Sequence, residues 1–345
     1  MKQLTKSTLF ILFISCLLSS PAFAASTGSA VFRLSMAGNY PDSHPVVQNA
    51  ILPWLNEIEV QSKGKVVVTY YGPDILIPQT AHFEAVRKAY VNMAHQHYGQ
   101  SQAKLLFTST MAIPSDFKNS LGASSAAWRL YKNLPELQKE YEGIKLLTLH
   151  SSPPLTLFTN FKITQFSDLQ HKKILCDTSD TALILRALGA TPLLEPMQSW
   201  VHNFSTLSAD GAVLSFDMLN SYNLMRLPLS YYLDLNVNVT PAWIGISKQD
   251  FEALPRDLRY IIENTSGEKL SLKIAQVLDS TCVSTKKTVT SANIEAIKLP
   301  VQSEQKCIEE LKNIAQNAWI VHSKEARIEN GEKILERIRR IYKSS

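Results

Sequence analysis

The stretch DLQHKKILCDTSDTALILRALGATPLLEPMQSWVHNFSTLSADGAVLSFD, residues 168–217, decides the fold. It opens with a short strand pattern around Ile174 and continues through helical spacing to the turn Leu188–Pro192. After a second helix pattern it ends on the run Ala209–Phe216. Strands and helices that alternate in this way predict an α/β lobe whose helices cover a sheet.

The chain outside this stretch repeats the same alternation. Runs of β-branched and apolar residues predict further strands, and apolar residues at helical spacing predict helices between them. The expected strands are Val31–Met36, Lys65–Tyr71, Val91–Ala94, Lys145–Leu149, Leu155–Phe158, Ala242–Ser247 and Glu295–Leu299. The expected helices are Ser43–Ser62 with a kink at Pro53, Gln79–Tyr90, one that begins near Pro255 with Asp257 in its first turn, and Ile320–Tyr342.

The N-terminus predicts export. Lys2 and Lys6 precede the apolar run 9–18, and the small residues around Ala24 are typical of a signal-peptidase site. The apolar run is shorter than the roughly 20 residues that a membrane-spanning helix needs. We therefore expect residues 1–24 to be a signal peptide that is cleaved after Ala24, which places the mature protein in the periplasm.

Charge and cysteine content exclude several classes of protein. Without the two leader lysines, the 35 basic side chains fall to 33, against 30 acidic ones. Such a near-neutral chain lacks the charge footprint of a nucleic-acid-binding protein. Cys176, Cys282 and Cys307 remain after cleavage, and their spacing matches no zinc motif. A Cys282–Cys307 disulfide stays open as an alternative, as does a lipoprotein built on Cys16.

Three segments carry a resemblance to a known family. They are an L-G-A-x-P turn at Leu188–Pro192, the segment Ala209–Phe216, and the motif L-P-x-D-L-x-x-I-I-E at Leu254–Glu263. The chain resembles the solute-binding proteins of TRAP (tripartite ATP-independent periplasmic) transporters, the dicarboxylate-receptor-like or DctP-type family. The similarity extends roughly from Ala30 to Tyr342.

The resemblance implies an α/β, two-lobed periplasmic-binding-protein-like fold of the type II-like class. Each lobe would be a helix-covered mixed sheet, and hinge strands and one long helix would join the lobes. The expected bounds are residues 28–150 with 239–280 for lobe I, and 151–238 with 281–345 for lobe II. The ligand cleft would lie between the lobes, where pockets preferentially form.

The resemblance also implies the function. The chain would be the extracytoplasmic solute-binding subunit of a TRAP-type secondary transporter. It would close its lobes on a small organic solute. One option for this solute is an organic acid with aromatic or less polar character. It would then deliver the solute to the small and large integral membrane subunits of a TRAP permease. Neither catalysis, a cofactor nor nucleic acid is expected, and the chain would be a monomer.

Two other functions stay open. One is a diverged ligand sensor or scaffold of the same fold that signals to a membrane receptor. The other is a periplasmic enzyme that uses the thiol of Cys176 beside Asp177. A thiol nucleophile needs a nearby base, and the sequence places none within reach.

The resemblance places ten candidate ligand-binding residues. Phe216 and Trp243 are expected to sandwich an apolar or aromatic body, and His44 is expected to donate a hydrogen bond to the solute. The full set is Tyr40, His44, Gln96, Tyr98, Leu175, Cys176, Met197, Leu214, Phe216 and Trp243.

One feature of the family is missing. An alignment without a gap puts Leu175 where the family has an Arg, whose planar guanidinium forks onto a ligand carboxylate. A second cation of the family falls near Leu155, which is also apolar. A buried His44, Lys172 or Lys173 is an alternative partner for an anion.

Two short patterns have more than one interpretation. His95 and His97 would share one face of a strand and could chelate a metal, but no third ligand stands at a metal-site spacing. Asp177 and Asp180 are either paired carboxylates or residues at a helix N-terminus, and the helix N-terminus is favoured.

Overall fold

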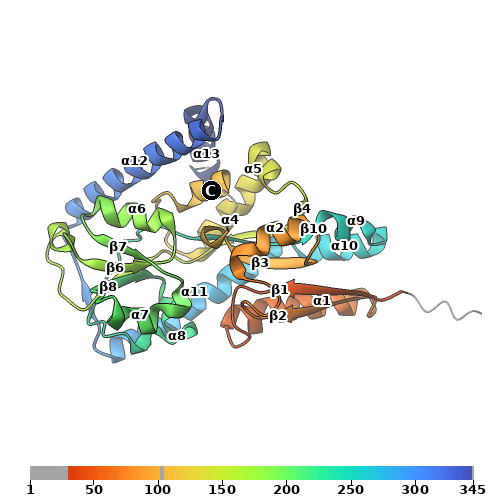
Figure 1. The fold of residues 1–345 in the computed structure, drawn as a ribbon, viewed down its shortest axis with the longest axis horizontal. Helices are drawn as coiled ribbons and strands as arrows, with labels where there is room; N and C mark the ends of the chain where they lie inside the picture. The colour runs from red at the N-terminus through yellow and green to blue at the C-terminus, as the bar shows by residue number, and fades with distance from the viewer. Residues whose placement is uncertain (1–29, 102–104, 344–345) are drawn as a thin grey trace, which may run out of the picture. The chain divides into compact units, whose positions relative to one another are not determined.

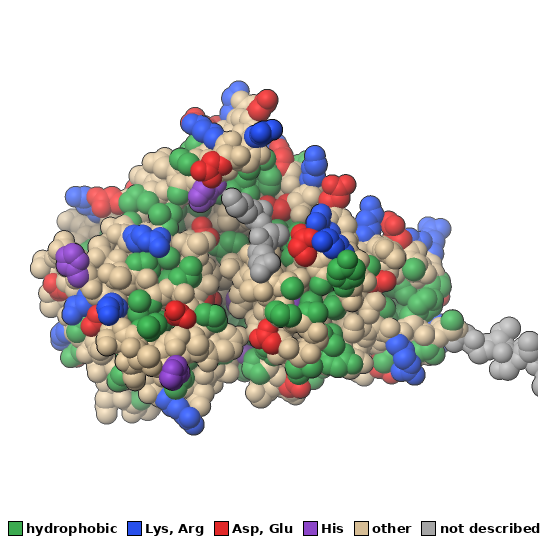
Figure 2. Space-filling model, in the orientation of Figure 1, with side chains coloured by type: hydrophobic (Ala, Val, Ile, Leu, Met, Phe, Trp, Pro, Cys, Tyr) green, Lys and Arg blue, Asp and Glu red, His purple; other side chains and the backbone are tan. Residues whose placement is uncertain are grey.

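The computed structural model describes residues 30–101 and 105–343, so the expected leader and Cys16 lie outside the described residues. These residues form two sheets, each covered by helices (Figure 1). No helix in the described ranges is long and apolar enough to cross a bilayer, and Figure 2 shows Lys, Arg, Asp and Glu side chains scattered over the face that it draws. The expected α/β fold with two helix-covered mixed sheets is confirmed.

The first sheet has the strand order β2-β1-β3-β10-β4. Its strands are β1 (Phe32–Ala37), β2 (Val66–Tyr71), β3 (Met93–His97), β4 (Ile144–Ser151) and β10 (Pro241–Ser247). β1 pairs in parallel with β2 and β3, whereas β10 runs antiparallel between β3 and β4. Because β1, β3 and β4 therefore run the same way, their carboxyl ends meet at one edge of this sheet.

The second sheet has the order β11-β9-β5-β8-β6-β7. Its strands are β5 (Thr156–Thr159), β6 (Lys173–Cys176), β7 (Thr191–Leu194), β8 (Gly211–Leu214), β9 (Tyr231–Leu233) and β11 (Glu295–Ile297). β6 pairs in parallel with β7 and β8, and β5 runs antiparallel to β8 and β9. The carboxyl ends of β6 and β8 therefore also share one edge. We call the two sheets with their helices the first and second lobes.

Gly211 is required where β8 passes β5. A Cβ atom at this position would lie 2.3 Å from the carbonyl oxygen of Phe158, a backbone atom that cannot move aside. We expect Gly211→Ala to lower the free energy of unfolding by about 3 kcal/mol, as overpacked cores do. Gly72→Ala is the matched control, because a Cβ there meets nothing closer than 3.4 Å. Equal urea midpoints for the two variants would contradict this account of β8.

Four connections join the lobes, and one of them is α12 (Val301–Glu325), whose Leu311 packs in the second lobe and whose Trp319 packs in the first. Two others are the extended segments that follow β4 and precede β10, and they are hydrogen-bonded to each other: Ser152 N donates to Thr240 O at 2.8 Å and Leu155 N to Asn238 O at 2.8 Å. The fourth is α11 (Glu268–Ser291), whose first half packs in the core of the first lobe and whose Val289 packs in the second. Paired extended segments and long helices are connections that allow hinge motion.

The remaining helices cover the sheets. In chain order they are α1 (Leu52–Gln61), α2 (His82–Arg87), α3 (Leu106–Ser109), α4 (Ser120–Asn133), α5 (Pro135–Glu140), α6 (Ser179–Ala187), α7 (Trp200–Thr206), α8 (Phe216–Ser221), α9 (Lys248–Ala253), α10 (Arg256–Thr265) and α13 (Gly331–Lys343). A π-helical turn, Val47–Ile51, precedes α1 and Pro53. Pro255 caps α10, and Asp257 lies in its first turn as expected.

The expected single helix Ile320–Tyr342 is wrong. α12 ends at Glu325, and α13 starts at Gly331 after Arg327 and Asn330 take left-handed backbone conformations. These two left-handed residues end a helix that apolar periodicity alone would continue. The turn lets α13 fold back onto α4.

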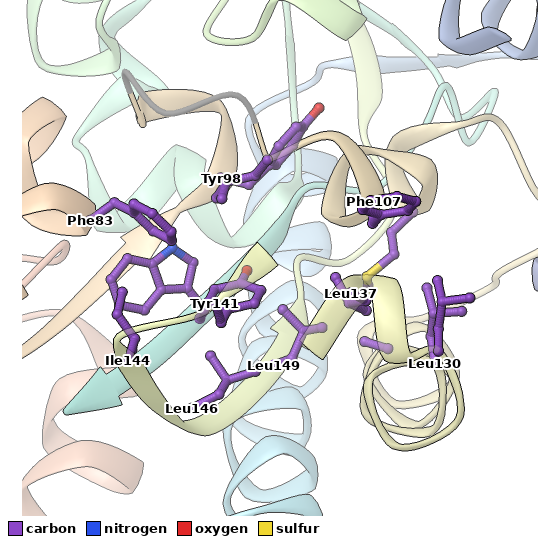
Figure 3. Close-up of a cluster of buried hydrophobic side chains, with 14 of the residues drawn as sticks. Phe83, Tyr98, Phe107, Leu130, Leu137, Tyr141, Ile144, Leu146 and Leu149 are labelled. Atoms are coloured by element: carbon purple, nitrogen blue, oxygen red, sulfur yellow. The ribbon is translucent and has the colours of Figure 1, made fainter. Parts of the chain in front are cut away.

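Each face of the first sheet packs against its own apolar core. One face carries Trp243, which contacts Phe83 and Tyr141. Leu130 of α4 and Leu137 of α5 lie in the same cluster (Figure 3). Side chains of α12 and α13, among them Trp319 and Leu335, pack into this same core. The lobe bounds predicted from the sequence stay a prediction, although residues beyond 318 contact the first lobe.

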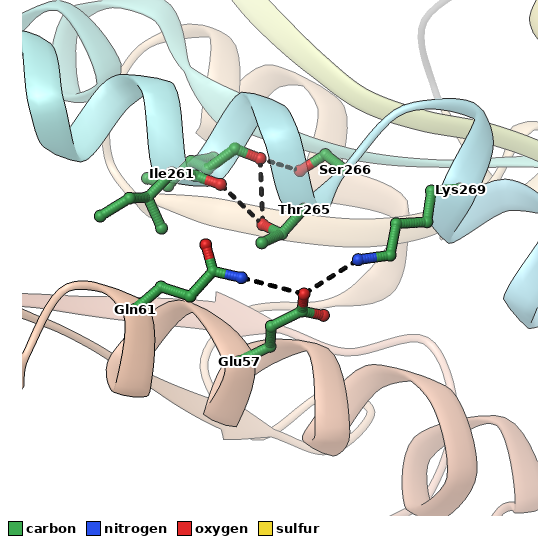
Figure 4. Close-up of polar contacts among 7 residues, drawn as sticks. Glu57, Gln61, Ile261, Thr265, Ser266 and Lys269 are labelled. Atoms are coloured by element: carbon green, nitrogen blue, oxygen red, sulfur yellow. Dashed lines mark hydrogen bonds and ion pairs between the residues drawn. The ribbon is translucent and has the colours of Figure 1, made fainter.

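The other face of the first sheet is covered by α1, α10 and α11. Glu57 of α1 accepts from Lys269 Nζ of α11 at 2.9 Å and from Gln61 Nε2 at 3.1 Å (Figure 4). Such exposed contacts contribute little free energy. The apolar side chains beneath them, including Trp54 and Ile274, hold these helices on the sheet.

Candidate functional site

Three histidines lie on one face of the first sheet, near its carboxyl edge. His95 and His97 alternate with Gln96 along β3 and therefore share a face. Ala242 of β10 lies opposite both His97 and His150 of β4, which places His150 on that face as well. His95 Nε2 and His150 Nε2 are 3.3 Å apart, so one nitrogen donates to the other.

Tyr40 and His44 cover the edge of this histidine group. Tyr40 follows β1, and its hydroxyl is hydrogen-bonded to His97 Nε2 at 2.8 Å. Its ring stacks on the imidazole of His44, with centroids 3.9 Å apart and planes 6° from parallel. Both residues are buried. Two of the ten predicted site residues are therefore brought together here.

Several buried polar atoms in this region have no protein partner. Burial lowers the pKa of His44 to about 3, so its imidazole is neutral at pH 7. His44 Nδ1 accepts from Val46 N at 3.1 Å, so the ring proton is on Nε2, which has no partner. The amide nitrogen and oxygen of Asn39, a residue only 1% exposed, are also unpartnered. Such atoms are costly unless something binds them.

The second lobe contributes two carboxylates. Asp177 follows β6, immediately before the N-cap residue Thr178, and Asp217 lies in the first turn of α8 after β8. Asp217 is buried and accepts from Ser215 Oγ at 2.5 Å and from Cys282 Sγ at 3.5 Å. Burial raises the pKa of each carboxyl group to about 6, so both are mainly ionised at pH 7.

The two lobes meet around these groups. The ring of Tyr222, after α8, lies 6.2 Å from that of His44. Burial, and then the neighbouring phenols and the charges of Asp217 and Asp177, raise the pKa of Tyr40 and of Tyr222. The charges of both carboxylates therefore raise the pKa of one phenol in each lobe.

A cavity of about 370 Å³ opens between the lobes beside Asp177. Gln79, Gly99 and Gln100 of the first lobe line one side, and Glu195 and Met197 of the second lobe line the other. A larger cavity, about 550 Å³, lies between residues 110–117 and the helices α12 and α13. None of the ten predicted site residues lines that larger cavity.

Four predicted residues form one apolar cluster in the second lobe: Leu175, Met197, Leu214 and Phe216. Cys176, the next residue on β6, faces the opposite core. Met197 also lines the interlobe cavity. The site position at Leu175 is therefore occupied by a side chain packed in the core.

The expected sandwich of Phe216 and Trp243 is not formed. Phe216 contacts the rings of Phe158 and Tyr232, whereas Trp243 lies in the core of the first lobe. Alternation along β10 directs Trp243 to the face opposite the three histidines. Gln96 shares that face, where its amide donates to the Gln79 carbonyl.

Lys172 and Lys173, alternative partners for an anion, lie at the start of β6. Lys172 Nζ is 3.8 Å from Asp210 Oδ1, and Lys173 Nζ donates to Leu207 O at 3.3 Å. Asp177 follows the other end of the same strand. These two cations are therefore not part of the edge that carries Asp177 and Asp217.

Tyr98 fastens the first lobe to the second. Its hydroxyl donates to Asp180 Oδ2 in the first turn of α6. The helix N-terminus favoured for Asp180 is confirmed, and Asp180 has this additional partner.

Loss of the Tyr98 hydroxyl is expected to weaken this contact. Tyr98→Phe leaves the half-buried carboxylate of Asp180 without its donor, which costs about 1.5–3 kcal/mol for a bond to a charged group. Urea unfolding measures the loss. Tyr90→Phe is the control, because Tyr90 is 79% exposed. If both variants unfold at the same urea concentration, the Tyr98 contact does not stabilise the protein.

Sequence reasoning missed Asn39, His150, Asp217 and Tyr222 as site residues, and it considered His97 only as a metal ligand. The strand was expected to end at Ala94, but β3 runs from Met93 to His97. A predicted strand that continued to His97 would have placed His97 and Gln96 on opposite faces of the sheet. Nothing local in the sequence indicates that His150 and Asp217 approach this region, because the register of separate strands places them.

The described residues show neither a cluster of metal ligands nor a disulfide bond. No group of three or more His, Cys, Asp or Glu side chains in the described ranges has an arrangement that would hold a metal ion. Cys176, Cys282 and Cys307 are free thiols, so the Cys282–Cys307 disulfide is not formed.

Comparison with known proteins shows the family. Residues 36–321 match the family described as bacterial extracellular solute-binding protein, family 7 (DctP). A search of curated proteins found no match.

Solved structures share the fold. A TRAP periplasmic solute-binding protein from Bordetella bronchiseptica, with bound (R)- and (S)-mandelate, aligns with a TM-score of 0.79 at 23% identity, over 90% of this chain and 99% of that one. A TRAP solute-binding protein from Rhodoferax ferrireducens, with copurified benzoate, aligns with a TM-score of 0.83 at 19% identity, over 91% and 98%.

A third structure is a Bordetella pertussis extracytoplasmic solute receptor binding pyroglutamic acid. It aligns with a TM-score of 0.76 at 17% identity, over 91% of this chain and 100% of that one. The family match spans most of the chain, and all three structures agree with it in fold. This chain therefore belongs to the family 7 bacterial extracellular solute-binding proteins.

Proposed function

We propose that this protein captures a small organic solute between its lobes outside the cytoplasm and delivers it to the two membrane subunits of a TRAP permease. It acts as a monomer and performs no chemistry on the solute. Its signal peptide is removed after Ala24. The relatives above are described with mandelate, benzoate or pyroglutamic acid, so small organic acids and related compounds are the first class to test.

One observation carries the proposal. Asn39 and His44, which carry polar atoms without protein partners, lie at the carboxyl edge of the first sheet, and Asp177 and Asp217 lie at the carboxyl edge of the second. In open α/β sheets, ligands bind outside the carboxyl ends of the strands. A solute in this position would contact both lobes at once.

Lobe closure follows from this placement. A solute that contacts both lobes binds the closed form more tightly than the open form, and it therefore shifts an existing equilibrium towards closure. The paired crossing segments, α11 and α12 supply the hinge. The closed surface is then what the membrane subunits recognise.

A thermal-shift screen tests solute capture. The mature chain is refolded to remove copurified solute and is screened against monocarboxylates, dicarboxylates, aromatic acids, amines and neutral polar compounds. A ligand at 100 times its Kd adds about 2.7 kcal/mol of stability and raises Tm measurably. A panel without any hit contradicts solute capture and favours a sensor or scaffold.

Variants of the candidate site test where a ligand from the screen binds. Asn39→Ala should lower its affinity about tenfold, because the buried amide loses its bonds to solute. Asn133→Ala should leave the affinity unchanged, since Asn133 is exposed. Small-angle scattering should show a smaller radius of gyration with ligand, and uptake by cells that express the two membrane subunits should require this protein.

A further inference from the structure

The two lobes are in contact beside the interlobe cavity. In the first lobe, a short helical turn, Tyr98–Gln100, follows β3. In the second lobe, Thr178 is the N-cap residue of α6, and Asp180 lies in the first turn of that helix. The Tyr98 hydroxyl donates to Asp180, and the next residue, Gly99, lies against Thr178. Two neighbouring residues of one lobe therefore contact a single helix turn of the other.

The contact at Gly99 leaves no space for a side chain. A Cβ atom at this position would lie 2.5 Å from Cγ2 of Thr178 and 3.1 Å from its Cβ. Carbon atoms normally pack at about 3.5–4.0 Å. The backbone of Gly99 is not in the left-handed region, so glycine is needed here for space rather than for backbone freedom. Rotation of the Thr178 methyl out of the way would break the helix cap, in which its hydroxyl accepts from Thr181 N at 3.2 Å.

This contact adjoins both the cavity and a hinge segment. Gly99 lines the cavity from the first lobe, and Ser179, the residue after Thr178, lines it from the second. In the same turn of α6, Thr181 Oγ1 accepts from Asn238 Nδ2 of a crossing segment at 3.3 Å. Because the contact lies close to a hinge segment, a small change in its spacing corresponds to a larger displacement at the far rim of the cavity.

Tyr98 holds the first lobe in this position. Its side chain is 6% exposed and packs in the same apolar core as Trp243. The hydroxyl is therefore fixed relative to the first lobe. A lobe rotation that separates Gly99 from Thr178 also draws this hydroxyl away from Asp180, so the bond favours the lobe spacing at which the contact is made.

We propose that Gly99 and Thr178 form a stop that fixes how closely the two walls of the interlobe cavity approach each other. The bond between Tyr98 and Asp180 holds the lobes against this stop. All four are positioning residues, since they act on the solute through the spacing of the walls. The proposal rests on the proposed function and adds what sets the size of solute that the cavity of about 370 Å³ accepts.

The distance between the lobes tests the stop directly. Spin labels on azide-bearing residues are introduced at Ile75 in the first lobe and Val201 in the second, because both positions are exposed. Pulsed electron paramagnetic resonance measures the label separation without ligand and with an excess of benzoate. We expect Gly99→Ala to lengthen the separation. Adding Thr178→Ser should restore most of it, because serine keeps the capping hydroxyl and lacks Cγ2.

Two further variants complete this test. Gly122→Ala is the matched control and should leave the separation unchanged, because Gly122 is exposed in α4. Tyr98→Phe keeps the stop but loses the bond, so it should also lengthen the separation, and Thr178→Ser should not reverse that change. Equal separations with and without Gly99→Ala, under both conditions, overturn the proposal. A lengthened separation that Thr178→Ser does not shorten overturns it as well, since the change then has another cause.

Selectivity for solute size is the second readout. Calorimetric titration compares benzoate with the longer 3-phenylpropionate. Gly99→Ala should lower the ratio of benzoate affinity to 3-phenylpropionate affinity about tenfold, as a change of one methylene in a pocket does, and Thr178→Ser should restore the ratio. An unchanged ratio overturns the role in size selection. If neither acid binds the protein without substitutions, the label separation still decides on the stop, and the wider thermal-shift panel decides on solute capture.

Discussion

Acidification from pH 7 to pH 5 should lower the free energy of unfolding of the solute-free protein by about 4 kcal/mol. Five buried histidines cause the loss. Burial holds the pKa of each below its usual value, so below pH 6.5 these rings take up fewer protons in the folded protein than in the unfolded chain. They are His44, His82, His95, His97 and His150.

Five carboxyl groups oppose the histidines, because burial raises their pKa; two of them are Asp180 and Asp279. Burial raises the pKa of Asp177 and Asp217 to about 6 and that of Glu140 to about 7, so the folded protein holds protons that the unfolded chain has released. Below pH 6 the unfolded chain therefore binds a net excess of about two protons, which corresponds to about 3 kcal/mol per pH unit. Stability is lost as the pH falls, because five histidines have a lowered pKa, whereas only three carboxyl groups have a pKa raised as far as about 6 or 7.

Urea unfolding at pH 7, 6 and 5 measures this dependence. His150→Gln should reduce the slope by about 1.4 kcal/mol per pH unit, the contribution of one proton. His202→Gln is the matched control, because His202 is exposed. A free energy of unfolding that is the same at pH 7 and pH 5 would show that the histidines are not buried in the neutral form.

Leu175→Arg should lower the free energy of unfolding by about 3–5 kcal/mol, because it buries a guanidinium without a counter-charge. Leu175 is fully buried, and it packs with Phe158 and Trp200 in the apolar cluster of the second lobe. The substitution restores the residue that the resemblance predicts at this position, yet the surrounding side chains offer it no partner.

Leu175→Met isolates the effect of charge. Met has nearly the volume of Leu and should cost less than about 1.5 kcal/mol. Urea unfolding of both variants, with benzoate titrations of each, measures the difference. A Leu175→Arg protein that is as stable as Leu175→Met and binds benzoate would show that this position opens to the site.

Local patterns predicted much of the fold. The strands at Phe32–Ala37, Val66–Tyr71 and Pro241–Ser247 agree with the sequence to within one residue, because β-branched runs bounded by turns identify buried strands. The start of α10 was also predicted, since Pro255 and Asp257 are typical of a helix N-terminus.

The site was harder to predict because separate strands build it. Sequence periodicity does not reveal that Ala242 lies between His97 and His150, since that depends on the register of three strands. The resemblance supplied Tyr40 and His44, which lie at this edge. It also directed attention to Trp243, which the alternation of β10 places on the opposite face.

A crystal structure of the mature protein with its highest-affinity screening hit tests the central claim most directly. We expect density for the solute between the lobes, in contact with Asn39 or His44 on one side and with Asp177 or Asp217 on the other. Density in the larger cavity beneath α12 and α13, with the space between the lobes empty, would contradict the account.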